Sequence, residues 1–252
     1  MKILTSILAF VFLSGCGGAN VLGVGEIGEV SDQVPILMYH YVREVDKVWD
    51  PLGWNLSVSP ELFERQMEYL QGSGYSSISM GDFLLGHADE RSVVLTFDDG
   101  LSDFYATALP ILEKYNFKAS NAVISGFIGR EGHMNEDEIF EIMESGVEIL
   151  SHSVYHKNLA SLSDADIRFE VSSSRDDLEE RFGVNIRGFV YPSGKFDRRV
   201  MRILGEEGYS FALSTEYGEA DLGEHDLMLL PRIRVDNRGG YEGFVKRLEE
   251  LE

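Results

Sequence analysis

The chain has 252 residues, of which 44% are hydrophobic and 26% are charged, as in an ordinary folded protein. That length suits one sizeable domain, and α/β barrels commonly form a single unit of this size. The formal net charge is −21, and so acidic a surface repels nucleic acid and anionic lipid and argues against polyanionic substrates.

The first residues have the pattern of an export signal. Lys2 precedes an apolar run over 3–13, which is too short to span a membrane but typical of a signal peptide. The run ends in Leu13-Ser14-Gly15-Cys16, which resembles the lipobox of bacterial lipoproteins, and Cys16 is the chain's one cysteine. We therefore expect 1–15 to be a lipoprotein signal peptide and Cys16 to carry a lipid. An uncleaved apolar start with an incidental cysteine is the alternative.

This interpretation makes the protein an exported lipoprotein, anchored at the cell envelope in the outer membrane and periplasm or at the cell surface. Residues 16–33 are rich in glycine and have no helical period, so we expect the lipidated cysteine to be followed by a flexible tether. The folded domain is then 34–252. It opens with a strand over 34–40 that ends in His40, which either lines a pocket or is a hydrogen-bonded structural histidine.

From there, strand and helix patterns alternate without an internal repeat. Short apolar runs predict strands at 34–40, 93–95, 119–125, 147–150, 186–191, 209–213 and 227–235. Helical spacing and end signals predict helices that begin after the N-cap Ser59 and at 102–115, 135–145, 163–182, 198–207 and 241–251. This order predicts a single α/β domain with a parallel sheet, closed or nearly closed into a barrel.

Two carboxylates follow one predicted strand and two imidazoles follow another. Asp98 and Asp99 come after the strand at 93–95, and His152 and His156 come after the strand at 147–150. An Asp-Gly pair often forms a hairpin, but here the next residues have helical composition, which favours a turn from strand to helix. If the two strands are parallel neighbours, their ends converge where α/β sheets and barrels carry their chemistry.

One carboxylate and two histidines form a facial ligand set for a divalent metal, with positions left open for water and substrate. His152 and His156 are four residues apart, so a helical turn after the strand would direct both rings to one side. Ser153 occupies the position that glutamate has in the zincin motif, so that motif is absent. The second carboxylate remains as a candidate base.

With these residues in place, the chain resembles the polysaccharide deacetylases of carbohydrate esterase family 4, the NodB-homology group, from about Pro35 to Val235. Thr96–Gly100 and His152–His156 are the most specific matches. The resemblance implies a distorted (β/α)7 barrel and metal-dependent hydrolysis of an acetyl group, usually an N-acetyl on a hexosamine polymer. The lipoprotein form resembles exopolysaccharide (poly-N-acetylglucosamine) deacetylases.

Carried over by position, the resemblance implies that Asp99, His152 and His156 bind the metal and that Asp98 is the general base. It also implies that a backbone N–H in the turn after the strand at 186–191, that of Ser193, stabilises the oxyanion. Zn²⁺ is the default metal for this ligand set, while Co²⁺, Ni²⁺ and Fe²⁺ also fit it.

Two positions depart from the family pattern. The family often has an arginine that orients the base, and Val190 occupies its position, with Arg187 near in sequence but not in the matching place. The family also often has a histidine as general acid in a late Leu-x-x-His stretch, and the stretch at 229–234 has none. His225 and His40 are candidate substitutes, with His40 the tentative choice.

The sequence therefore predicts a hydrolase acting on linear amides, which removes N-acetyl groups from an N-acetylglucosamine polysaccharide at the cell envelope. Its partners would be the acetylated polysaccharide and, through Cys16, a membrane, but no nucleic acid. An O-acetyl esterase of the xylan type is one alternative. A glycan-binding lipoprotein with a weakly active or inactive barrel is another. Polymer linkage, oligomeric state and the identity of the membrane stay open.

Overall fold

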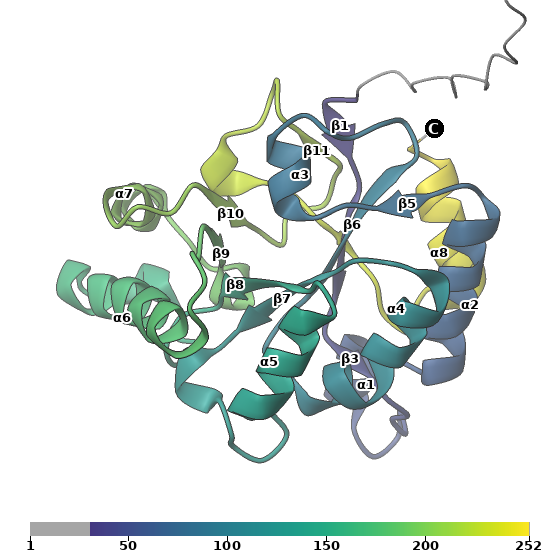
Figure 1. The fold of residues 1–252 in the computed structure, drawn as a ribbon, viewed down its shortest axis with the longest axis horizontal. Coiled ribbons are helices and arrows are strands. Elements are labelled where there is room, and N and C mark those ends of the chain that lie inside the picture. Colours follow the sequence, from purple (N-terminus) through teal and green to yellow (C-terminus); the bar gives the residue numbers. More distant parts are fainter. Residues whose placement is uncertain (1–30, 252) are drawn as a thin grey trace, which may run out of the picture.

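A curled parallel sheet runs through the centre of the molecule, and the computed structural model describes residues 31–251 (Figure 1). Seven strands follow one another in the order β10-β9-β8-β7-β6-β2-β12, and a short β5 pairs with the amino end of β6. They are β2 (Ile36–Tyr39), β5 (Ser76–Ser77), β6 (Ser92–Phe97), β7 (Ser120–Val123), β8 (Glu148–Ser151), β9 (Gly188–Val190), β10 (Phe211–Leu213) and β12 (Ile233–Arg234).

The sheet curls almost into a barrel. A parallel bridge between Leu213 of β10 and Leu230 brings the stretch before β12 against the far end of the sheet. Because every neighbouring pair in the order is parallel, the carboxyl ends of all these strands lie at one edge. The predicted single α/β domain with a curled, barrel-like parallel sheet is confirmed.

Most of the helices lie on the outer side of the sheet (Figure 1), whereas the short helix with Met80 and Phe83 packs these side chains into the apolar layer inside the curl. They are α1 (Pro51–Leu56), α2 (Pro60–Gly72), α3 (Met80–Leu84), α4 (Leu109–Tyr115), α5 (Glu136–Glu144), α6 (Asp164–Phe182), α7 (Arg198–Glu206) and α8 (Gly240–Glu249). The last helix, α8, lies beside α2, so the end of the described chain packs next to its first long helix.

Alternation along each strand divides the apolar side chains between two layers. On β6, Leu95 and Phe97 pack outward against the helices, whereas Val94 points into the curl of the sheet. The inner layer also contains Leu150 of β8 and Val190 of β9. Both faces of the strands are therefore buried, which explains why they read as continuous apolar runs in the sequence.

Local signals set the ends of the long helices. Ser59 caps α2 by accepting from the Leu62 N–H at 3.1 Å, and Pro60 follows at the first helical position. Ser163 caps α6 in the same way, and Gly183 ends that helix in a left-handed conformation with φ of 67°. These boundaries are confirmed as the sequence predicted them.

Three segments differ from the sequence prediction. Within 102–115, Phe104–Ala108 forms wider π-helical turns before α4, which accommodate Pro110. The strand expected over 227–235 is reduced to Ile233–Arg234, because Leu227–Leu229 forms a 3₁₀ turn and Pro231 has no N–H to donate. Gln33, expected in the tether, belongs to a strand.

That strand is β1 (Gln33–Val34), which pairs antiparallel with β11 (Ala220–Asp221) at the amino-terminal edge of the sheet. A second small pair, β3 (Tyr41–Val42) with β4 (Ser57–Val58), lies just after β2. Further 3₁₀ turns occupy Ser125–Phe127, Leu159–Ser161 and Pro192–Gly194. The predicted signal peptide, the lipid-bearing Cys16 and the tether up to residue 30 lie outside the described residues. Among residues 31–251, no helix combines the length and apolarity needed to cross a membrane.

Candidate active site

Two neighbouring carboxylates at the end of β6 point to different places. Asp98 is buried, with 3% of its surface exposed, whereas Asp99 is partly exposed. Asp99 has a φ of 79°, a left-handed conformation that non-glycine residues seldom adopt. This turn breaks the strand alternation at Asp99, so the two acids can take separate roles although they are adjacent in sequence.

The two histidines predicted to follow β8 converge on Asp99. The Oδ1 of Asp99 lies 3.4 Å from the Nε2 of His152 and 3.5 Å from the Nε2 of His156. A helical turn was expected between the histidines, and that detail is wrong. Instead, Ser153 and His156 have left-handed φ angles of 62° and 54°, and the Ser153 hydroxyl accepts from the His156 N–H at 2.9 Å.

These three side chains fit a divalent cation. One ligand atom from each lies within 4.8 Å of the others. Ligands about 2.0–2.2 Å from a zinc ion lie roughly 3–3.6 Å from each other, which the two separations from the Asp99 oxygen match. The Nδ1 of His152 lies 2.7 Å from the carbonyl oxygen of Val190, to which it donates when the proton is on Nδ1. This contact directs the free Nε2 toward Asp99, as in histidines that bind metals.

Backbone strain marks the same region. Five non-glycine residues between 31 and 251 have positive φ, and four of them are Asp99, Ser153, His156 and Ser193. Such conformations cost about 1–3 kcal/mol each and persist where the surrounding structure requires them. Their concentration at one edge of the sheet indicates that this edge, rather than the packed barrel below it, is under functional constraint.

Arg232 holds the buried Asp98 in a bidentate ion pair. Its Nη1 donates to Oδ1 at 2.7 Å and its Nη2 to Oδ2 at 2.8 Å. The Nε donates to the carbonyl oxygen of Ser214 at 2.8 Å, and Nη1 also contacts the Thr96 hydroxyl at 3.0 Å. Burial raises the pKa of Asp98, but the charge and hydrogen bonds of Arg232 outweigh it and hold that pKa well below its usual range.

Sequence reasoning missed Arg232. It left the arginine that orients the base unassigned because Val190 stands in its usual place, and it looked for a histidine in the late Leu-x-x-His stretch. Arg232 occupies that histidine position, three residues after Leu229, and reaches Asp98 from just before β12. The available signal was a pair of arginines, Arg232 and Arg234, within an apolar stretch, because an arginine that such a stretch buries requires a partner.

His40 also lies near Asp98. Its Nε2 is 3.9 Å from the Oδ2 of Asp98, and 13% of the histidine side chain is exposed. Burial lowers the pKa of His40 and outweighs the opposite effect of Asp98 and Asp99. His40 is therefore the histidine that the fold brings to the site. His225 lies elsewhere, next to β11, where its Nδ1 accepts from the Asp221 N–H at 3.0 Å.

Ser193 follows β9 at the same edge. The neighbouring Gly194 N–H donates to the Tyr191 carbonyl oxygen at 2.9 Å, and Ser193 itself is exposed with a φ of 53°. Its position after the carboxyl end of β9 agrees with the sequence prediction. Arg187 precedes β9 and is exposed, so it lies at the opposite edge and does not reach Asp98.

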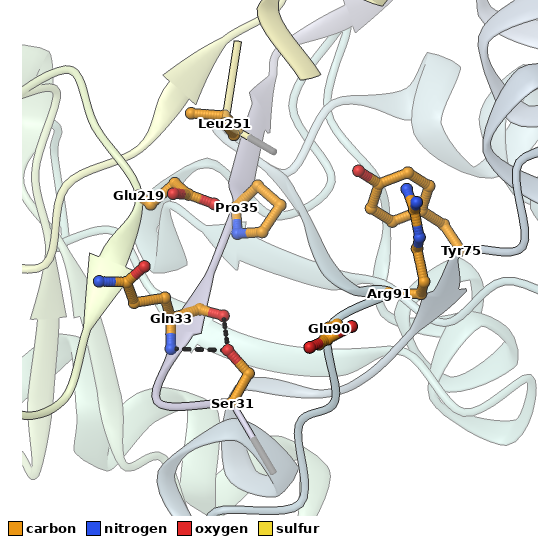
Figure 2. A pocket seen from close by; sticks show the side chains of 8 residues that line it. All are labelled: Ser31, Gln33, Pro35, Tyr75, Glu90, Arg91, Glu219 and Leu251. Carbon is orange, nitrogen blue, oxygen red and sulfur yellow. Dashed lines mark hydrogen bonds between the residues drawn. The ribbon is translucent and has the colours of Figure 1, made fainter. Parts of the chain in front are cut away.

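A separate hollow of about 370 Å³ lies at the amino-terminal edge (Figure 2). Its lining includes Gln33, Pro35, Glu90 and Glu219, which precede or flank the starts of strands. In Figure 2 the Ser31 hydroxyl bonds both the N–H and the carbonyl oxygen of Gln33. None of the predicted catalytic residues lines this hollow, so the site is confined to the carboxyl edge.

Comparison with known proteins gives consistent matches. The model of the polysaccharide deacetylase family matches residues 86–212. A poly-β-1,6-N-acetyl-D-glucosamine N-deacetylase of Staphylococcus aureus is 28% identical over 211 residues, which cover 77% of this chain and 72% of that protein. The deacetylase PplD of Streptococcus pyogenes, solved in complex with acetate, matches with a TM-score of 0.79 and 30% identity, over 85% of this chain and 97% of that chain. IcaB of Ammonifex degensii has a TM-score of 0.73 at 21% identity, over 86% of this chain and 97% of that chain, which is a likeness of fold.

Proposed function

The chain belongs to the polysaccharide deacetylase family, and we propose that it removes N-acetyl groups from an N-acetylglucosamine-containing polysaccharide at the cell envelope. The observation that carries the proposal is that two adjacent acids have different partners. Asp98 is paired with a buried guanidinium, and Asp99 faces two imidazoles across 3.4 and 3.5 Å. A base and a metal site side by side are what hydrolysis of an unactivated amide requires.

Asp99, His152 and His156 would hold the metal, with Zn²⁺ the expected ion for these oxygen and nitrogen ligands. A divalent cation there would lower the pKa of a water molecule and polarise the acetyl carbonyl. Asp98 takes the proton of the attacking water. Arg232 keeps the Asp98 carboxylate ionised and fixes its orientation through two hydrogen bonds.

Attack forms a bond between the water oxygen and the acetyl carbon, and collapse breaks the bond from carbon to nitrogen. The Ser193 N–H is the chain's own donor to the carbonyl oxygen as negative charge develops on it. The leaving nitrogen needs a proton, and His40, which lies 3.9 Å from Asp98, is positioned to deliver it. The products are acetate and a free amine on the sugar.

The substrate assignment is supported by the relative from Staphylococcus aureus, whose name specifies a poly-β-1,6-linked N-acetylglucosamine. The lipobox-like stretch ending in Cys16 supports export and anchoring by a lipid. In this proposal residues 1–15 are the signal peptide, 16–33 contain the lipidated cysteine and the link to the domain, and 34–252 are the deacetylase domain.

Two alternatives use the same site. An O-acetyl esterase acting on xylan would need no different residues, because an ester is hydrolysed by the same base and metal. A glycan-binding lipoprotein of low activity is the other alternative. The bidentate pair between Asp98 and Arg232 favours an enzyme, since burying a charged pair costs desolvation that simple glycan binding does not require.

Acetate release from the metal-loaded full chain tests the proposal. The substrates are β-1,6-linked and β-1,4-linked N-acetylglucosamine oligomers and acetylated xylan. We expect release from an N-acetylglucosamine oligomer, with the faster linkage identifying the polymer. Release from acetylated xylan alone would replace the proposal with the esterase. If the protein binds metal and glycan but releases acetate from none of the three substrates, the glycan-binding lipoprotein becomes the favoured function.

A further inference from the structure

A basic hollow lies beside the catalytic edge. It has a volume of about 500 Å³ and is lined by Tyr217, Arg234, Asp236, Arg238, Gly239 and Arg247. Arg234 is the last residue of β12 and pairs in register with Met38, two residues before His40. Arg234 is therefore near the proposed general acid, where burial lowers the pKa of His40 and the charge of Arg234 adds to that effect, although His40 does not line the hollow.

The charge around this hollow is opposite to that of the rest of the chain. Residues 231–247 contain five basic and two acidic side chains, whereas the whole chain carries −21. A local excess of arginine on so acidic a protein concentrates positive potential at one place on the surface. Charge alone does not identify a ligand, but it restricts the ligand's sign.

Arg234 is the central residue of the hollow. Side chains two apart on a strand share a face, so Arg234 points to the same side as Arg232, one step nearer the solvent. Arg234 is partly buried, and burial lowers the pKa of its guanidinium, while Asp98 and Asp236 oppose that effect. Both acids are already engaged, Asp98 by Arg232 and Asp236 by Arg238.

Within residues 31–251, the Arg234 guanidinium makes no hydrogen bond or ion pair. Its backbone carbonyl accepts from Arg247, which places a second guanidinium against the same strand. The guanidinium is half-buried and lines the hollow, so its N–H groups are available to a ligand. A bound group with acceptor oxygens would supply the missing partner.

The amino end of α8 provides a second, independent feature. This helix of ten residues begins at the hollow, and its N-cap, Gly239, has no side chain to bond the first N–H groups, of which that of Gly240 donates to the Asn237 carbonyl oxygen at 3.3 Å. Uncapped N–H groups and the helix dipole attract negatively charged ligands. Glu242 in the first turn partly neutralises the positive end of the helix dipole. The lining of the hollow is still basic, because it includes Arg234, Arg238 and Arg247.

We propose that this hollow is a subsite for one anionic group of the glycan, a phosphate or a carboxylate carried near the N-acetylated sugar. The inference rests on the proposed deacetylase function and specifies its substrate class. A single anionic substituent can be bound by Arg234 and the end of α8, whereas a fully anionic polymer would be repelled by the acidic surface elsewhere. Arg234 is thus a residue that determines specificity.

Calorimetric titration of the metal-loaded full chain with inorganic phosphate tests the subsite without turnover. Arg234→Gln should weaken binding about tenfold or more, because charge-assisted hydrogen bonds to an anion are strong. Arg234→Lys keeps the positive charge but loses the paired N–H donors of the guanidinium, so its phosphate affinity should lie between those of the wild type and Arg234→Gln. Arg187→Gln, which removes an exposed arginine at the opposite edge, is the matched control and should bind as the wild type does.

Equal phosphate affinity in wild type and Arg234→Gln would overturn the subsite, because phosphate would then sit elsewhere, for example on the metal. So would an absence of binding to the wild type. Circular dichroism and metal content of each variant would identify misfolding, and Arg234→Lys carries the test if Arg234→Gln misfolds.

A kinetic arm separates this proposal from the proposed function. We would measure KM for two oligomers, a neutral N-acetylglucosamine oligomer and one with a 6-phosphate or a carboxylate on the adjacent sugar. The quantity compared is the ratio of the first KM to the second. In the wild type the ratio should be about tenfold, and in Arg234→Gln it should approach one. Acetate release without any preference would remove the subsite and leave the function. Phosphate binding that depends on Arg234, without acetate release from any oligomer, would remove the function and leave the anion site.

Discussion

Two acidic side chains inside the curl of the sheet differ in their partners, because one has a cation beside it and the other has only uncharged donors. Asp98 lies at the carboxyl edge and bonds a guanidinium through both oxygens. Glu148 begins β8 at the amino edge, and its partners are the Ser120 hydroxyl at 2.8 Å and the Met80 N–H at 3.0 Å, neither of them charged. Burial raises the pKa of both, but only Asp98 has a cation that reverses the effect.

The comparison shows how one barrel interior can be structural at one end and reactive at the other. Along β8, Glu148, Leu150 and His152 alternate onto the same face, and the apolar layer around Leu150 separates the two polar ends. At the amino edge a carboxylate serves only as an acceptor that joins α3 to β7 and β8. At the carboxyl edge the ionised Asp98 is maintained by the buried Arg232, which also bonds the Ser214 carbonyl oxygen and the Thr96 hydroxyl.

Removing the cation should produce the largest effect on stability. Arg232→Met leaves Asp98 buried without its partner, and breaking such a pair costs about 3–5 kcal/mol. Urea unfolding at pH 7 measures this loss. The pKa of Asp98 in the folded wild type lies below that in the unfolded chain, so the pair stabilises the fold above the unfolded pKa and loses this contribution as the pH falls toward the folded one.

Adding Asp98→Asn to Arg232→Met should recover part of the lost stability, because the double variant contains no unpaired buried charge. If Arg232→Met were to unfold at the same urea concentration as the wild type, the guanidinium would not be what holds Asp98 ionised.

His40→Asn should act on the reaction and leave the fold unchanged. Loss of a positioned proton donor lowers the rate about 10²–10⁴-fold, so kcat should fall within that range while bound metal stays constant. His225→Asn is the matched control, because His225 lies beside β11, away from the site, and its replacement should leave kcat unchanged. Equal kcat in His40→Asn and the wild type would show that the leaving nitrogen takes its proton from another donor.

Glu148→Gln should change the free energy of unfolding least, and it should raise stability where Arg232→Met lowers it. The folded pKa of Glu148 is raised, so the folded state binds the proton more tightly than the unfolded state does, and its stability falls as the pH rises through that window. Glutamine keeps an acceptor for both donors and removes the charge, so a gain below about 1 kcal/mol is expected at pH 7. The gain should disappear in acid, and urea unfolding at two pH values measures it; a loss at pH 7 would mean that Glu148 has a cationic partner.

The same contrast explains what the sequence could and could not predict. Asp98, Asp99, His152 and His156 follow strands that were expected to be parallel neighbours. The structure places β7 between β6 and β8, but the carboxyl ends still lie at one edge, so the residues meet as predicted. Arg232 could not be assigned in this way, because it is 134 residues from Asp98 in sequence and lies just before a strand of only two residues, Ile233–Arg234. The left-handed turns were also hidden, because positive φ is uncommon for non-glycine residues and the enrichment of Asp and His there is too weak to predict it at Asp99 or His156.

The fold was easier to predict than the site, because apolar alternation and caps such as Ser59, Ser163 and Gly183 act locally. A strand was predicted at Leu227–Leu229 because these side chains are apolar. The structure has a 3₁₀ turn there instead, because the Asp226 carboxylate accepts from the Met228 N–H and bends the chain. Side-chain hydrogen bonds of this kind compete with the sheet and are invisible to hydrophobic patterns.

The most direct test of the division between the two acids measures bound metal and acetate release in the same samples of wild type, Asp98→Asn and Asp99→Asn. Our account predicts that Asp98→Asn binds one metal per chain, as the wild type does, and releases acetate about 10²–10⁴-fold more slowly. It predicts that Asp99→Asn loses the metal and the activity together. Acetate release by Asp98→Asn at the wild-type rate, or loss of its metal, would contradict the assignment of Asp98 as base and Asp99 as ligand.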